Sequence, residues 1–156
     1  MGLDQYLTTD QYFSDTWDKT ADQARQITEV CKIPAGLIDR INATVEITLM
    51  EWHKCYWLHG FIVAAAQSYD EQHKTLVDNL VLERFIHSAD KIIDKDVNPN
   101  NGQFYQMWDL FPYPDEWPNP QTYDSDDLEI LYRTREKFKQ ILNEIPDVDL
   151  AYIISV

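Results

Sequence analysis

Three residues with chemically useful side chains recur at every fourth position in the middle of the chain. Glu51, Cys55 and His59 would present a carboxylate, a thiol and an imidazole on one stripe of a helix, drifting by only about 80° in total. A zinc site would need a fourth ligand, for which His87 and Asp90 are candidates. Cys55 and His59 also suggest a nucleophile and its base. Apolar residues share the stripe and nothing nearby supplies an oxyanion hole, so we expect a buried, hydrogen-bonded His59, no metal and no catalytic residue.

A second arrangement at the same place suggests a pocket. Trp52 and Lys54 could offer an aromatic wall and a cation to an anionic ligand, with His59 and Tyr6 as further lining residues. The structural alternative is a core tryptophan beside a lysine that reaches into solvent along its aliphatic stem. If the protein has a pocket, we expect it at the turn from Leu49 to Lys54.

The segment from residue 96 to residue 132 has an unusual composition. It holds no Lys or Arg, eight acidic residues, five of the seven prolines and many aromatic residues. The prolines exclude a regular helix, so we predict a long loop over 96–123. Prolines lower the entropy lost on binding, and aromatic side chains act as anchors. The segment is therefore either a lid on the sheet or a binding site for a basic partner, with contacts expected at Tyr113, Asp115, Glu116 and Trp117.

Charge and composition reduce the number of function classes that we expect for this chain. The chain of 156 residues has 27 acidic and 13 basic residues, a formal net charge of −14, which disfavours direct binding of DNA or RNA. No apolar run approaches the roughly 18 residues of a membrane span. The N-terminus has no basic flank and carries Asp4, so we do not expect a signal peptide. Cys31 and Cys55 do not form a Cys-x-x-Cys motif, and we expect two reduced, buried thiols and no cofactor.

The periodicity of apolar residues predicts a single α+β domain over residues 1–156. We expect about three strands, at roughly 3–13, 43–50 and 149–155. In the second, Val45, Ile47 and Leu49 alternate with polar residues, which is typical of a half-buried strand. Residues 68–78 are polar and predict a loop. Three main helices pack on this sheet, and the predicted helical stretches are roughly 16–31 (capped by Ser14 or Thr16), 52–67 (buried), 79–94 and 125–144.

Four segments resemble a family of small phage and prophage proteins. Met1-Gly-Leu-Asp-Gln-Tyr-Leu is similar to the family opening Met-Gly-Leu-Asp-Met-Tyr-Leu. Trp52-His-Lys-Cys-Tyr-Trp-Leu-His-Gly-Phe-Ile-Val63 resembles the central Trp-Arg-Lys-x-Asn-x-Ile-His-x-Trp-Phe-Val. Asp126-Asp-Leu-Glu-Ile-Leu and Asp149-Leu-Ala-Tyr-Ile-Ile-Ser look like the late helix and the final strand. His53, Tyr56 and Phe61 replace the family Arg, Asn and Trp. The resemblance implies a phage gene expressed in the host bacterial cytoplasm, and it implies no particular activity.

These observations favour a non-enzymatic phage accessory protein that binds and modulates or inhibits a host protein with a basic surface. Mimicry of nucleic acid charge is a special form of this hypothesis. One alternative is a small enzyme or ligand-binding module with its pocket at Trp52, Lys54 and His59. Another is a virion or assembly component. The sequence leaves the oligomeric state open.

Overall fold

The computed structural model describes residues 3–16, 18–66, 74–93, 110–111, 123–146 and 149–155 of the chain. The chain divides into two compact units: unit 1 comprises Met1–Thr8 and Leu49–Val156, and unit 2 comprises Thr9–Thr48. Two long strands, β1 (Asp4–Ser14) and β2 (Asn42–His53), contribute residues to both units. The expectation of a single domain stays a prediction.

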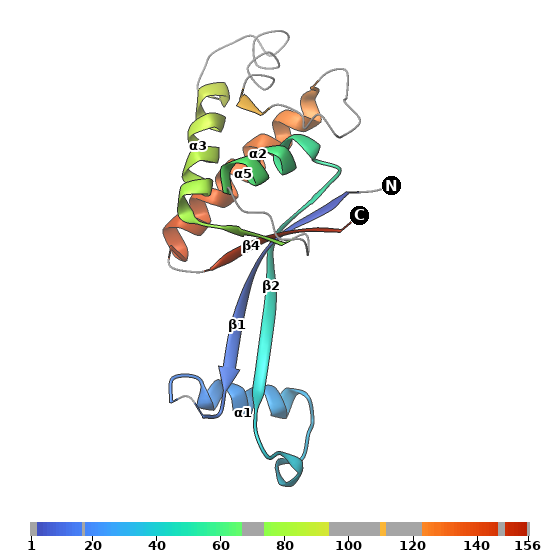
Figure 1. Ribbon diagram of the computed structural model, residues 1–156, viewed down its shortest axis with the longest axis vertical. Helices are drawn as coiled ribbons and strands as arrows, with labels where there is room; N and C mark the ends of the chain where they lie inside the picture. Colours follow the sequence, from blue (N-terminus) through green and yellow to red (C-terminus); the bar gives the residue numbers. More distant parts are fainter. Residues whose placement is uncertain are drawn as a thin grey trace. The chain divides into compact units, whose positions relative to one another are not determined.

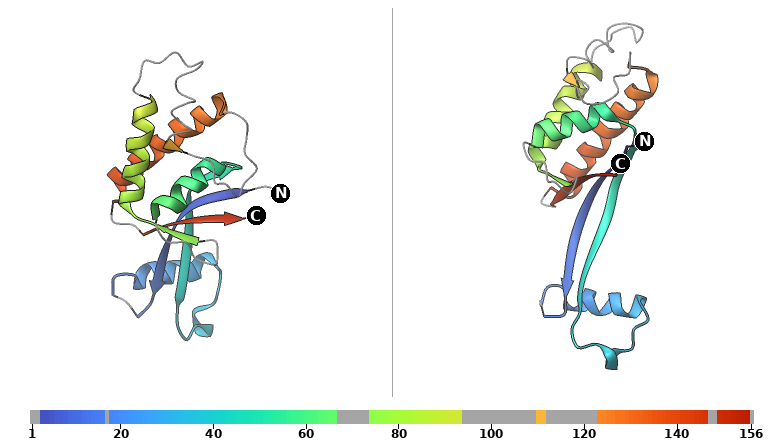
Figure 2. Two further views of the ribbon diagram at one scale, coloured as in Figure 1. Left: turned by 45° about the horizontal axis from the view of Figure 1, so that its top comes forward. Right: turned by 45° about the vertical axis from the view of Figure 1, so that its right-hand side comes forward.

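The fold is α+β, as predicted. Its strands form one four-stranded sheet in the order β2-β1-β4-β3 (Figure 1). In unit 1, the helices lie together on one face of the strands (Figure 2). The elements beside β1 and β2 are α1 (Ala21–Val30), the single 3-10 turn η1 (Ala35–Leu37), α2 (Tyr56–Ala66), β3 (Lys74–Val77), α3 (Asn79–Ile93), α5 (Ser125–Glu144) and β4 (Leu150–Ser155).

The strand β3 corrects the prediction of a loop over 68–78. It runs antiparallel to β4, with Lys74 opposite Ile153 and Val77 opposite Leu150. Thr75 and Val77 are buried while Leu76 is exposed. A segment of four residues with one outward leucine is too short for its periodicity to predict a strand. It forms a strand because it pairs with β4.

The junction between β2 and α2 also differs from the prediction. The second strand does not end near residue 50, and the helix does not begin at 52. Met50 and Trp52 are buried and Glu51 and His53 are exposed, so the alternation of a strand continues to His53. Lys54 then adopts a left-handed conformation with φ 54°, which ends the strand. Its N–H donates to the Leu3 carbonyl at 2.6 Å, and α2 begins two residues later.

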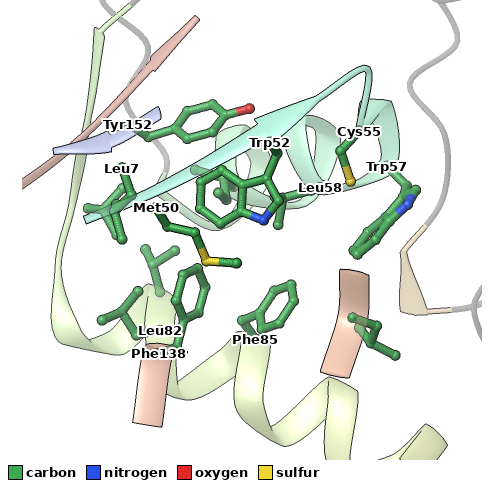
Figure 3. Packing of buried hydrophobic residues seen from close by; sticks show 14 of the residues in the cluster. Leu7, Met50, Trp52, Cys55, Trp57, Leu58, Leu82, Phe85, Phe138 and Tyr152 are labelled. Atoms are coloured by element: carbon green, nitrogen blue, oxygen red, sulfur yellow. The ribbon is translucent and has the colours of Figure 1, made fainter. Parts of the chain in front are cut away.

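Trp52 belongs to the core of unit 1 and is 1 % exposed. Its indole N–H donates to the Thr134 hydroxyl of α5 at 2.8 Å. Its ring meets Phe138 edge-on at 6.3 Å between centroids and lies 6.5 Å from the ring of Tyr152 (Figure 3). Trp52 therefore joins β2, β4 and α5 in one contact group.

Aspartate side chains cap the starts of α3 and α5. Asp78 accepts the Val81 N–H at 3.0 Å. Asp124 caps α5 in a capping box with Asp127, whose carboxylate also accepts the Trp57 indole N–H at 2.9 Å. Burial raises the pKa of Asp127 above its usual value. Asp126 and Asp127 lie in the first turn of α5, where the helix dipole favours negative charge.

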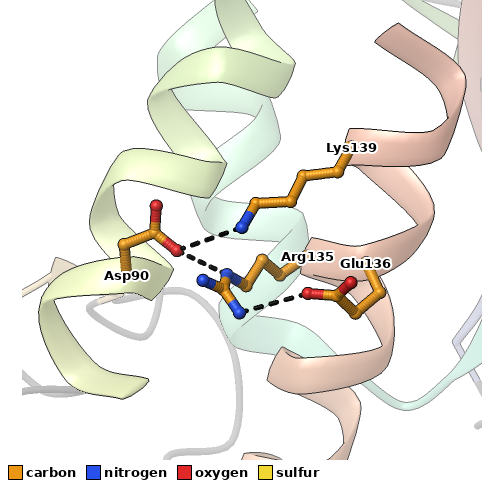
Figure 4. A network of polar contacts seen from close by, with 4 residues as sticks. All are labelled: Asp90, Arg135, Glu136 and Lys139. Carbon is orange, nitrogen blue, oxygen red and sulfur yellow. Dashed lines mark hydrogen bonds and ion pairs between the residues drawn. The ribbon is translucent and has the colours of Figure 1, made fainter. Parts of the chain in front are cut away.

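A polar network links α3 to α5 (Figure 4). The Arg135 guanidinium donates to the Asp90 carboxylate and also contacts Glu136 at 3.1 Å. The Lys139 ammonium lies 3.6 Å from the same Asp90 oxygen. Arg135 is 15 % exposed, so its ion pair with Asp90 is partly desolvated and holds the register of the two helices. Asp90 is engaged here and not in a metal site with Glu51, Cys55 and His59.

In unit 2, α1 is shorter than the predicted helix over 16–31. It begins at Ala21, and Thr20 is its N-cap residue. Ser14 and Thr16 do not cap it. Their hydroxyls lie 2.9 Å apart, and the Thr20 hydroxyl donates to the Ser14 carbonyl at 3.1 Å and accepts the Ser14 N–H. These short polar side chains stabilise a turn instead of a helix start.

We predict that Thr134→Val lowers the free energy of unfolding by about 1–3 kcal/mol, because the buried Trp52 indole N–H would lose its acceptor. Urea unfolding followed by tryptophan fluorescence measures this change. Thr134→Ser keeps a hydroxyl and is the matched control, for which we expect less than half the loss. A loss in Thr134→Ser with none in Thr134→Val would show that the methyl group, and not the hydrogen bond, matters at this position.

Candidate functional site

The four residues expected to line a pocket lie in different environments. Trp52 and His59 are buried, at 1 % and 7 % exposed. Lys54 is exposed at the turn, and Tyr6 is half-buried between the buried neighbours Gln5 and Leu7 of β1. Trp52 and His59 pack into the interior while Lys54 faces solvent, so the four do not share one wall. The pocket proposed for them stays a hypothesis.

The interior at this junction holds a hydrogen-bond network built on Gln5, which the sequence analysis did not single out. The Gln5 amide donates to the Cys55 carbonyl and to the Tyr152 hydroxyl, both at 2.8 Å, and accepts the Cys55 N–H at 3.0 Å. The Tyr152 hydroxyl lies 3.2 Å from His59 Nδ1. A glutamine in a run of alternating residues gives no signal of its own, because only the folded sheet brings position 5 to positions 55 and 152.

This network and the surrounding burial determine whether Cys55 and His59 could act as a nucleophile and its base. The expectation of a buried, hydrogen-bonded His59 is confirmed. The regular stripe with Glu51 does not form, since Glu51 belongs to β2 and α2 starts at Tyr56. Burial raises the pKa of the Cys55 thiol far above its usual value, which disfavours the thiolate that a nucleophile needs. Among the residues that the structure describes, no group of three or more His, Cys, Asp or Glu side chains could hold a metal ion.

A surface cluster lies on the outer side of the same strands. His53 Nδ1 is 2.8 Å from the Asp4 carboxylate, and its Nε2 is 3.4 Å from the Glu51 carboxylate. The hydrogen bond to Asp4 raises the pKa of His53, and Glu51 adds to the shift. The pKa of Tyr6 is also raised, by loss of solvent around its hydroxyl and by Asp4 and Glu51. The outward positions of adjacent strands thus gather two carboxylates around one imidazole.

An open groove of about 660 Å³ lies beside the strand β2, near the turn where a pocket was expected. Met50 and Glu51 form part of its lining, and Arg133 and Lys137 of α5 contribute two cations. Because acids and bases both line it, the groove has no strong preference for one sign of charge. Trp52, Lys54 and His59 are not among the residues of this lining, which also includes Glu136 and Gln140.

The expected partner-binding residues Tyr113, Asp115, Glu116 and Trp117 lie outside the described residues, as does most of 96–123. The structure does describe Leu110, Phe111 and Tyr123 of that segment. Phe111 and Tyr123 are buried in the core, and the Tyr123 hydroxyl donates to the Phe111 carbonyl. Phe111 contacts Trp57 with 5.3 Å between ring centroids.

Unit 2 carries most of the exposed apolar side chains that the structure describes. It is a surface that the sequence analysis missed, because the alternation at Val45 and Ile47 indicated a half-buried strand. That expectation is wrong there: Val45 is 37 % and Ile47 is 48 % exposed. Cys31 is exposed too, against the expectation of two buried thiols. Six of the nine large exposed apolar residues belong to unit 2: Tyr12, Val30, Ile33, Leu37, Val45 and Ile47.

Comparison with known proteins adds no function. No protein-family model, no curated protein and no solved structure matches this chain. Within the described parts of the chain, none of the helices has both the length and the apolar character that crossing a membrane requires.

The two cysteines should differ in reactivity. We expect iodoacetamide to alkylate Cys31 in the native protein and to leave Cys55 unmodified, because Cys55 is buried and its pKa is raised. Peptide mass spectrometry after timed labelling measures both sites, and labelling in concentrated urea is the control in which both react. Labelling of both thiols at equal rates under native conditions would contradict the buried position of Cys55.

His53 should make stability depend on pH. Its folded-state pKa is raised above 6.5, so its contribution is fully present below pH 6.5 and is lost as pH rises through the folded pKa. We expect His53→Gln to lower the free energy of unfolding more at about pH 5 than at about pH 8. Urea unfolding at both pH values measures this difference. In an NMR titration, Asp4→Asn should lower the pKa of His53; an unchanged pKa would mean that this hydrogen bond does not form in solution.

Proposed function

We propose that this chain is a small, acidic, phage-encoded accessory protein that binds and modulates or inhibits a host protein in the bacterial cytoplasm, without catalysing a reaction. The phage origin rests on the sequence resemblance. The observation that carries the binding role is the contrast between interior and surface. The Cys55 backbone and the His59 imidazole belong to the buried network that joins β1, α2 and β4, and the Cys55 thiol is buried, while unit 2 presents apolar side chains to solvent.

Electrostatics supports a basic partner. The formal charge of −14 is large for 156 residues and gives long-range attraction to positively charged surfaces. Tyr113, Asp115, Glu116 and Trp117 combine aromatic anchors with acids in a proline-rich stretch, and we propose that they contact the partner. Phe111 and Tyr123, on either side of this stretch, are buried in the core and would tether it to unit 1.

A ligand-binding module is the second candidate, and one observation favours it. The groove beside Met50 and Glu51 lies near the turn where the sequence suggested a pocket, and Arg133 and Lys137 could contact an anionic group there. Its mixed charge and open shape give it less support than protein binding, since ligand sites are generally enclosed and mostly apolar.

The host-binding proposal predicts capture of a specific protein from a lysate of the bacterial host. We expect the tagged chain to retain one basic host protein reproducibly, and Asp115→Ala, Glu116→Ala and Trp117→Ala combined to reduce its recovery by about tenfold or more. Quantitative mass spectrometry of the eluates measures the recovery.

The matched control is a triple alanine variant of two acidic residues and one aromatic residue that are also exposed, Glu83 of α3 and Glu129 and Tyr132 of α5. Circular dichroism of both variants checks that each is folded. If the unmodified chain retains no host protein above a tag-only control, the proposed function is wrong. If both triple variants retain the partner equally well, the role of the acidic segment is wrong while the binding function stands.

A further inference from the structure

The strand β2 has an open edge in unit 2. It is the first strand of the order β2-β1-β4-β3, so among the strands that the structure describes β1 is its one neighbour. An edge strand offers a row of backbone N–H and C=O groups to any other extended chain. Proteins commonly protect such edges with prolines, charges or covering elements. From Thr44 to Thr48 every residue of β2 is exposed, none is proline and Glu46 carries the one charge, so the edge is accessible over this stretch to a segment that complements Glu46.

The pairing with β1 shows which backbone groups point outward. The Asp15 N–H donates to the Ile41 carbonyl at 3.2 Å, so the backbone of Ile41 faces β1. Because the direction alternates along a strand, Ala43, Val45 and Ile47 also face β1. The N–H and C=O groups of Thr44, Glu46 and Thr48 therefore face the open edge.

The same register separates the two faces of the strand. The Ser14 hydroxyl donates to the Asn42 side chain at 3.2 Å, which places positions 14 and 42 opposite each other on one face. Glu46 lies four residues from Asn42 along the strand, so its carboxylate is on the same face, between Thr44 and Thr48.

The other face is apolar. Val45 lines a groove of about 480 Å³ together with Phe13 of β1 and Ile27 and Val30 of α1. Val30 is 81 % exposed, and Ile47 extends the apolar surface along β2 from Val45. An added strand beside β2 would continue the apolar surface over the groove and cover side chains that are now in contact with water.

We propose that this edge pairs antiparallel with an extended segment of the host partner that has the pattern apolar–basic–apolar. The basic residue lies opposite Glu46, exchanges backbone hydrogen bonds with it and places its cation beside the Glu46 carboxylate. Its two apolar neighbours lie opposite Val45 and Ile47 on the groove side. This inference rests on the proposed function and specifies the kind of segment that is bound.

A second copy of the chain fits the edge less well than a basic segment. The antiparallel register that pairs Val45 of one copy with Ile47 of the other also places Glu46 opposite Glu46. Like charges directly opposite each other destabilise a strand pair. A lysine or arginine at that position of the partner replaces this repulsion by attraction, in agreement with the net charge of −14.

The test is an NMR titration of the isotope-labelled full chain with capped peptides. The probe is Thr-Thr-Val-Lys-Val-Thr-Thr, and a matched peptide has Glu in place of Lys. We expect the largest amide shifts at Thr44, Glu46 and Thr48, and about fivefold tighter binding of the Lys peptide. Glu46→Lys in the chain should reverse this preference, and Leu76→Lys on the opposite edge strand β3 should leave it unchanged.

Methylation of single peptide nitrogens tests the backbone pairing directly. Methylation at the Lys removes an N–H that faces β2 and should abolish binding. Methylation at a neighbouring Val removes an N–H that faces away, and we expect a change of no more than about twofold. Equal effects of the two methyl groups, equal affinity for the Lys and Glu peptides, shifts outside β2 and α1, or no binding of either peptide would each overturn the inference.

The lysate experiment distinguishes failure of edge pairing from failure of the proposed host-binding function. If the chain retains a host protein and Ile47→Lys does not reduce its recovery, edge pairing is wrong and host binding stands. If the chain retains nothing while the Lys peptide binds as expected, the edge is a peptide site and host binding is wrong.

Discussion

The hydrogen bonds of the buried Gln5 amide are the constraint on which unit 1 depends. Gln5 is fully buried, so an unpaired donor or acceptor there costs about 1–3 kcal/mol. Its partners are the backbone of Cys55 and the hydroxyl of Tyr152, on two chain segments far apart in sequence. These bonds and the one from Lys54 to the Leu3 carbonyl fix the point at which β2 ends. Where α2 begins, and which of its side chains enter the core, follows from that point.

The same constraint explains why a promising set of residues does not form an active site. Glu51, Cys55 and His59 have helical spacing, but the left-handed backbone at Lys54 separates the strand residue Glu51 from the helix. Cys55 supplies backbone groups to Gln5, and its thiol is buried. His59 meets the Tyr152 hydroxyl that Gln5 also contacts. Residues that suggest catalysis when taken singly are here part of one structural network, because an interior polar group is retained only where its partners are fixed.

The sequence predicted the elements whose signals are local. α3 and α5 have apolar stripes and acidic caps at Asp78 and Asp124, and the structure has both helices within a residue of the expected bounds. The sequence could not predict β3, which exists through its pairing with β4. It also could not predict Gln5, because nothing local distinguishes a buried glutamine from a solvated one. The sequence did not predict that β2 extends through Trp52. The Tyr, Trp and Leu that follow Lys54 continue the apolar run with the periodicity of a helix, so Trp52 was assigned to the helix.

In unit 2 the local sequence pattern predicts the strand correctly but does not predict whether its apolar side chains are buried. Val45 and Ile47 do alternate with polar residues, and the segment is a strand, yet both side chains remain exposed. Among the described residues of this unit of 40, Ser14 and Ala24 are the two that are buried. Units of about 40 residues rarely bury enough surface to be stable without additional contacts. The alternating pattern therefore produced an apolar surface on β2, and neither β1 nor α1 covers that surface fully. The partner segment proposed above would cover this apolar strand face and place its basic residue beside the Glu46 carboxylate, so the specificity proposed for unit 2 and its small core have the same physical origin.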